Sequence, residues 1–209
     1  MPAMRIERTR RNFTDETNRY DAKRDRLIRC ARELGEQGNA AKVSVTDITS
    51  KMGITRGLFY YYFGGKNELN ESIVESYVDD LRTSAIEACA NAETREDAIQ
   101  AIVVCVYNWL FDENGKPLPM GHVLKEMNLV EYARLRASDE LATLAIREGL
   151  LVKYGKGGDE ALYDRARFVM TGILGEVRLR PDTSLENIAD AACAALRYRK
   201  RRMSQDECE

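Results

Sequence analysis

Arginine, tyrosine and lysine side chains gather in one short stretch of the chain, TRGLFYYYFGGKNEL, residues 55–69. Five aromatic residues follow one another from Phe59 to Phe63, in a chain that holds 10 Tyr, 5 Phe and 1 Trp. A tyrosine can pack its ring on a sugar and donate its hydroxyl to a phosphate, and an arginine can bind a guanine edge with two hydrogen bonds. Arg56 ahead of the aromatic run and Lys66 behind it therefore indicate a surface that contacts nucleic acid.

The five aromatic side chains cannot all face one core, because successive residues of a helix are rotated by about 100°. Phe59 and Phe63 are four residues apart and share a face, so we expect them to point inward. Tyr60, Tyr61 and Tyr62 must then cover the sides and the outer face. Tyr60 is expected to bind phosphate. Tyr61 is favoured over Tyr62 as a second contact, because it shares a face with the glycine just ahead of the run.

Residues 44–63 have the spacing of a helix-turn-helix, with two short helices joined by MGIT. Ser44 or Thr46 is expected to cap the first helix, and Thr55 the second, because hydroxyl oxygens accept hydrogen bonds from the free amides at a helix start. Gly53 fits the turn between them, where the backbone often needs a positive φ.

The second helix of such a motif lies in the major groove of DNA, with its first residues facing base edges. Gly57 has no side chain and would allow close approach to the groove. Ile48, Ile54 and Phe59 are the apolar residues expected to set the angle between the two helices.

Charge is unevenly distributed along the chain. Residues 1–66 carry 14 Lys and Arg against 8 Asp and Glu, whereas the whole chain carries 32 against 34. A basic head on an acidic body is typical of a chain whose head faces nucleic acid. The first 22 residues are expected to form a basic arm, for which a DNA contact and a solvated tail both stay open. The stretch MRIERTRRNF within it carries Arg5, Arg8, Arg10 and Arg11.

Composition argues against several other classes of protein. No apolar run approaches the roughly 18 residues of a membrane span, and no apolar segment follows the N-terminal arginines as in a secretory signal. Five cysteines without a Cys-x-x-Cys pair are typical of reduced cytoplasmic thiols, and a single histidine leaves no zinc site. No nucleophile–base pair or phosphate-binding loop is indicated, so we expect no enzyme, cofactor or metal.

The expected fold is all-α, with about nine helices, because apolar residues recur at helical spacing and only four prolines interrupt the chain. The loop DENGKPLPMG separates the first five helices from the rest. The later helices are expected at about 121–134, 138–154, 158–178 and 182–202.

The stretch SVTDITSKMGITRGLFYYYFGGKNEL resembles the DNA-binding head of the TetR family of transcriptional regulators. The resemblance covers about 45 residues from Arg24 to Leu69, and departs from the usual family pattern at Thr49, Met52 and the pair Tyr61–Tyr62. The matching positions are Ser44, Ile48, Gly53-Ile54-Thr55, Gly57, Phe59-Tyr60, Phe63, Lys66 and Leu69.

The resemblance implies a homodimeric regulator, in most cases a repressor, that binds a near-palindromic operator in double-stranded DNA. It implies a DNA-binding domain at 23–68 and an effector-binding and dimerisation domain at 69–209. The last two helices, about 158–178 and 182–202, would form the dimer interface. The residues expected at the DNA are Ser44, Thr46, Thr55, Arg56, Gly57, Tyr60, Tyr61 and Lys66.

A small-molecule effector is also implied, acting through a hinge near residues 67–90. Glu126 and Arg147 could recognise a polar group, although an ordinary surface charge accounts for each. The candidate pocket residues, each of which could equally be core or surface, are Cys105, Tyr107, Trp109, His122, Met127, Tyr132 and Phe168. Two alternatives stay open: a DNA-binding protein controlled by a protein partner, and a head used only for protein contacts.

Overall fold

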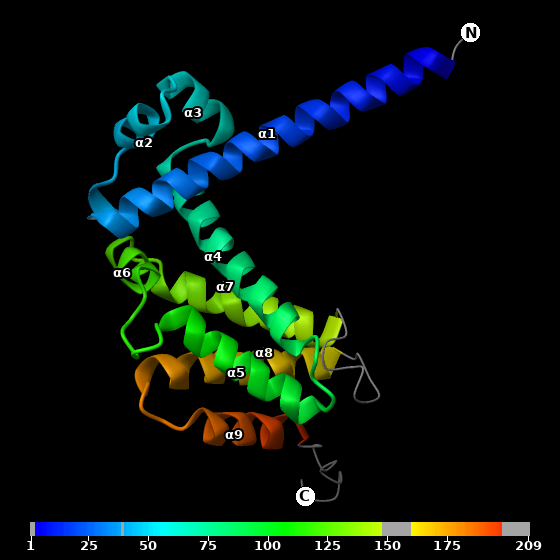
Figure 1. Cartoon of the computed structure of the whole chain (residues 1–209), viewed down its shortest axis with the longest axis vertical. Coiled ribbons are helices and arrows are strands. Elements are labelled where there is room, and N and C mark those ends of the chain that lie inside the picture. Colours follow the sequence, from blue (N-terminus) through cyan, green and yellow to red (C-terminus); the bar gives the residue numbers. More distant parts are fainter. Residues whose placement is uncertain (1–2, 39, 148–159, 198–209) are drawn as a thin grey trace, which may run out of the picture. The chain divides into compact units, whose positions relative to one another are not determined.

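The computed structural model describes residues 3–38, 40–147 and 160–197, and these fold as helices without a strand (Figure 1). This confirms the all-α expectation. None of the helices in these ranges is both long and apolar enough to cross a membrane. The elements are α1 (Ala3–Gln37), η1 (Ala40–Lys42), α2 (Val45–Met52), α3 (Arg56–Tyr62), α4 (Lys66–Cys89), α5 (Arg95–Leu110), α6 (Pro119–Glu126), α7 (Val130–Ala142), the π-helical turn η2 (Thr143–Arg147), α8 (Glu160–Leu179) and α9 (Leu185–Arg197).

The chain divides into two compact units, which we call the head and the body. The head comprises Met1–Tyr77 and Pro119–Ala133, and the body comprises Val78–Leu118 and Arg134–Glu209. The head unit runs past residue 68 and also takes in α6. Helix α1 begins at Ala3. The expected arm at 1–22 and DNA-binding domain at 23–68 stay predictions.

A row of polar contacts joins α1 to the first half of α4 within the head. The Arg24 guanidinium donates to Ser72 Oγ at 2.7 Å, and Arg32 donates to Ser76 Oγ at 2.5 Å. One turn further, Tyr77 Oη donates to Glu36 Oε1 at 2.8 Å. Beside this row α1 buries the apolar stripe expected from the sequence, including Leu27, Ile28 and Ala31. Apolar burial holds the two helices together, and the directional hydrogen bonds define their register.

The body is organised around α5, which packs on α8 and α9. Thr94 and Asp97 form a capping box at the start of α5. The α5 side chains Ile99, Ile102 and Val103 are fully buried. These residues form the apolar centre of the body.

The expected single helix over 121–134 is wrong, because the chain breaks there. α6 ends at Glu126, Asn128 has a φ of 58°, and α7 begins at Val130. Asparagine is one of the few residue types that tolerate this left-handed conformation, so Asn128 is compatible with a helix end. The apolar periodicity on both sides of it nevertheless predicted a continuous helix. The next expected helix, 138–154, is replaced by the end of α7 and η2, and its residues 148–154 lie outside the described ranges.

The break at Asn128 generates a testable expectation. Asn128→Ala should lower the free energy of unfolding by about 1 kcal/mol, because alanine pays the full steric cost of a left-handed backbone. Asn128→Gly should not lower the free energy of unfolding through backbone strain, because glycine adopts a positive φ freely. Urea denaturation of the two variants measures the difference. Equal stability of the alanine and glycine variants would contradict a strained turn at this position.

Candidate nucleic-acid interface

The first helix of the helix-turn-helix begins with a complete capping box. Ser44 Oγ accepts from the Asp47 amide at 3.2 Å, and Asp47 Oδ2 accepts from the Ser44 amide at 2.8 Å. The Ser44 hydroxyl also donates to Asp47 Oδ2 at 2.7 Å, and this bond and the one from the Ser44 amide lower the pKa of the Asp47 carboxyl, because they favour its charged form. Ser44 rather than Thr46 is therefore the cap, and Thr46 lies exposed in the first turn of α2.

The turn follows the expected chemistry. Gly53 ends α2 in the left-handed region, with φ 66° and ψ 34°, and its amide donates to the last turn of the helix. Thr55 then caps α3 by accepting from the Leu58 amide at 3.2 Å. The local residues that define a helix-turn-helix are all in their expected roles.

Three aromatic side chains of α3 and its C-cap are buried. Phe59 is 0% exposed and Phe63 is 1% exposed, as expected, and their rings lie 5.5 Å apart. Tyr62, which the sequence places on the outer side, is instead only 6% exposed. The reason is α1: the ring of Tyr20 packs on Tyr62 with centroids 4.8 Å apart. Burial, with the neighbouring phenols, raises the pKa of Tyr62.

The opposite side of α3 presents polar and aromatic groups to solvent. Tyr60 is 54% exposed and Tyr61 is 67% exposed. Arg56 is exposed in the first turn and donates to Thr46 Oγ1, which holds the guanidinium against the start of α2. A Cβ at Gly57 would meet only Thr55 Oγ1, at 3.9 Å, so nothing inside the head requires a glycine there. This face can donate hydrogen bonds to an anionic backbone and to base edges.

Lys66 has a structural contact as well as its expected role at phosphate. Its ammonium donates to the carbonyl of Ala41 at 3.1 Å, which ties the start of α4 to η1. Ahead of α4, Glu68 Oε2 accepts from the Gly64 amide at 2.7 Å. A side-chain carboxylate therefore already satisfies one amide where the sequence suggested room for an anion.

The seven expected pocket residues are divided between the two units. His122, Met127 and Tyr132 belong to the head, and the other four belong to the body. Cys105 is buried, which raises the pKa of its thiol, and its Sγ lies 3.4 Å from the carbonyl of Ser84. Phe168 is 80% exposed and lies on the surface of α8.

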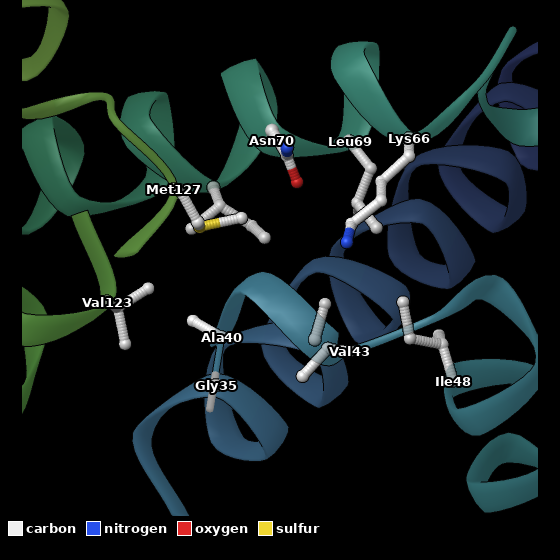
Figure 2. Close-up of a pocket in the computed structure, with 11 residues that line it drawn as sticks. Gly35, Ala40, Val43, Ile48, Lys66, Leu69, Asn70, Val123 and Met127 are labelled. Atoms are coloured by element: carbon white, nitrogen blue, oxygen red, sulfur yellow. The ribbon is translucent and has the colours of Figure 1, made fainter. Parts of the chain in front are cut away.

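The head contains a small cavity bordered by α1, η1, α4 and α6 (Figure 2). Met127 and Val123 form one side, and Asn70 points into it from α4 with an Oδ1 that is buried without a hydrogen-bond partner. Its volume of about 10 Å³ is the space of a single water, so it cannot hold an effector.

Glu126 proves to be a structural residue of the head. Its Oε2 accepts a hydrogen bond from the Ala40 amide, and its Oε1 lies 3.2 Å from His122 Nε2. This carboxylate joins the end of α6 to η1. Its surroundings account for both Glu126 and His122 without a ligand.

Two residues of α1 that support α3, Tyr20 and Arg24, were not predicted to do so, because they lie more than 15 residues before the helix-turn-helix at 44–63. The Arg24 guanidinium lies 4.9 Å from the centre of the Phe63 ring, where a cation is attracted to the face of an aromatic ring. Their positions became evident only from the packing of α1 against α3.

These features define an all-helical protein with an N-terminal helix-turn-helix. Residues 27–73 match the family described as bacterial regulatory proteins, tetR family. The HTH-type transcriptional regulator BetI of Agrobacterium fabrum is 32% identical over 72 residues, and that of Rhizobium meliloti 31% over 72 residues. Residues 27–73 of this chain are thus similar to the helix-turn-helix region of TetR-family regulators.

The similarity to the curated relatives covers only part of each protein. The match covers 34% of this chain and 34% and 35% of the two BetI proteins, about a third of their length. Over the whole fold, the crystal structure of RolR in complex with the ligand resorcinol superposes with a TM-score of 0.60 at 16% identity, and the match covers 87% of this chain and 89% of RolR. The all-helical fold is therefore shared well beyond the head.

Because Tyr62 is buried and Tyr61 is exposed, replacing them should lower the stability of the protein by different amounts. Tyr62→Ala should lower the free energy of unfolding by about 3 kcal/mol, because it empties a buried site. Tyr61→Ala should cost about 1 kcal/mol or less, since only edge contacts with other rings are lost. Chemical denaturation of both variants provides the comparison. Similar losses for the two would show that Tyr62 is not the buried member.

Proposed function

We propose that this chain is a dimeric transcriptional regulator that binds operator DNA through α3 and acts as a repressor released by a small-molecule effector. The observation that carries the proposal is the two-sided nature of α3. Buried Phe59, Tyr62 and Phe63 anchor the helix, while Arg56, Tyr60 and Tyr61 point to solvent. The BetI relatives, which are similar to this chain over 72 residues, are HTH-type transcriptional regulators.

In the proposed complex α3 enters a major groove with its N-terminal turn leading. Arg56 binds a guanine edge. Its hydrogen bond to Thr46 already restricts the guanidinium in the free protein, so less conformational entropy is lost on binding. Tyr60 and Tyr61 pack on sugars and donate to phosphates, and Lys66 adds positive charge beside them. The cytoplasm, where DNA is accessible, is the proposed location.

The proposed dimer forms through α8 and α9. These helices border an open groove of about 400 Å³ with a largely apolar lining that includes Ile173, Ile188 and Ala192. Phe168 stands at its edge, and a Cβ at Gly172 would meet no atom within 4 Å. An exposed aromatic beside a groove lined by small residues suits a second copy of the same surface, as a two-fold interface requires.

The effector is proposed to bind within the body, where Cys105, Tyr107 and Trp109 lie on α5. It can act only by favouring one arrangement of the two heads over the other. Control by a protein partner is the alternative, and thermal-shift screening of metabolites distinguishes the two, because a specific small ligand raises the melting temperature. No enzymatic activity is proposed.

The DNA contact is tested with a duplex selected from a random pool by the wild-type protein. Arg56→Ala should cost about 1–3 kcal/mol of discrimination at a single base position, because one bidentate contact is lost. Tyr60→Phe should weaken binding to all sequences by about 1.5 kcal/mol, because it removes one hydrogen bond to a phosphate.

Fluorescence anisotropy at constant salt measures both effects. Arg180→Ala is the control, because it removes an exposed arginine of the body that pairs with Glu176. Unchanged affinity and specificity in Arg56→Ala would contradict the proposal that α3 contacts the bases.

The dimer is tested separately at Phe168. Phe168→Glu should weaken dimerisation at least about a hundredfold, because it would bury an unpaired carboxylate in the interface. Leu135→Glu is the matched control, since Leu135 is also an exposed apolar residue of the body but does not line the groove. Sedimentation equilibrium reports both. A Phe168→Glu protein that remains as dimeric as the control would place the interface elsewhere.

A further inference from the structure

Tyr20 of α1 contacts both tyrosines at the end of α3. Its ring meets Tyr61 edge to face, with centroids 5.6 Å apart and planes at 76°, and lies 4.8 Å from the ring of Tyr62. Tyr61 and Tyr62 in turn lie 5.2 Å apart at 80°. Each ring therefore touches the other two, and we call the three residues the tyrosine triad.

The members of the triad differ in exposure, and this difference suggests separate roles. Tyr62 is buried, Tyr20 is half-buried and Tyr61 is largely exposed. An exposed side chain normally samples several rotamers and loses that freedom on binding. The ring of Tyr61 is instead bordered by two aromatic rings at edge-to-face geometry, which favours one orientation before any partner arrives.

We propose that Tyr20 is a positioning residue, which orients the ring of Tyr61 for contact with the DNA backbone. The inference rests on the proposed function, because it assumes that Tyr61 faces DNA. It adds to the DNA-binding surface a residue of α1 that lies outside both the helix-turn-helix and the matched region 27–73.

The anchoring of α3 does not depend on Tyr20 alone. Phe59 and Phe63 are buried against each other, and Arg24 covers the Phe63 ring. The Tyr20 hydroxyl reaches the Tyr62 carbonyl only at 3.5 Å, a long hydrogen bond. The ring of Tyr20, rather than its hydroxyl, is therefore the part that orients Tyr61.

The experiment is a double-substitution cycle on Tyr20 and Tyr61, with the duplex that the wild-type protein selects from a random pool. Tyr20→Leu is expected to weaken binding about three- to tenfold, the range of an aromatic pair contact, and Tyr20→Phe to stay within about twofold of the wild type. Tyr61→Leu should also weaken binding. The double variant should bind no more weakly than Tyr61→Leu alone, because Tyr20 acts through that ring.

Multiplying losses in the double variant would overturn the inference, since Tyr20 would then act independently of Tyr61. It would equally fall if Tyr20→Leu or Tyr61→Leu bound as tightly as the wild type. Ile28→Val, a buried change on the same helix, controls for lost stability, and it should leave affinity unchanged at temperatures where all variants are folded. A wild-type protein that selects no duplex would overturn the proposed function itself, and this inference with it.

Discussion

Helix α3 is only seven residues long, and a helix of that length is not stable alone in water. Its conformation therefore depends on burial of the aromatic side chains at its inner side. Phe59, Tyr62 and Phe63 provide that burial, and the caps Thr55 and Gly53 only determine where the helix begins and how the chain enters it. The exposed side chains of α3 are therefore positioned by this small aromatic core, because it holds the helix that carries them.

α1 is the element that completes this core and connects it to the rest of the head. Tyr20 and Arg24 cover the end of α3, and the next turns bind α4 through Ser72, Ser76 and Tyr77. Burial and the bond to Glu36 raise the pKa of the Tyr77 phenol, so it remains a neutral hydrogen-bond donor at physiological pH. The register between α1 and α4 thus rests on neutral and charged hydrogen bonds beside an apolar stripe.

Features that depend on neighbouring residues were predictable from the sequence. The capping role of Thr55, the choice of Ser44 or Thr46 as the earlier cap, the turn at Gly53 and the inward pair Phe59–Phe63 follow from spacing within one or two helical turns. The burial of Tyr62 and the surface position of Phe168 depend on elements distant in sequence. The pocket residues stay predictions, because an aromatic or methionine at helical spacing looks the same in a core, a cavity or an exposed face.

The sequence by itself determined a helical chain with a helix-turn-helix, a basic N-terminal part and an aromatic run whose side chains cannot all face one core. These are local properties, set by backbone preference, helical periodicity and side-chain chemistry. Only the tertiary structure decided which tyrosine of the run is buried, because the answer depends on where α1 passes. It also decided that Glu126 has a structural role in joining α6 to η1. Its partner, the amide of Ala40, is far away in the sequence and reaches Glu126 only in the folded chain.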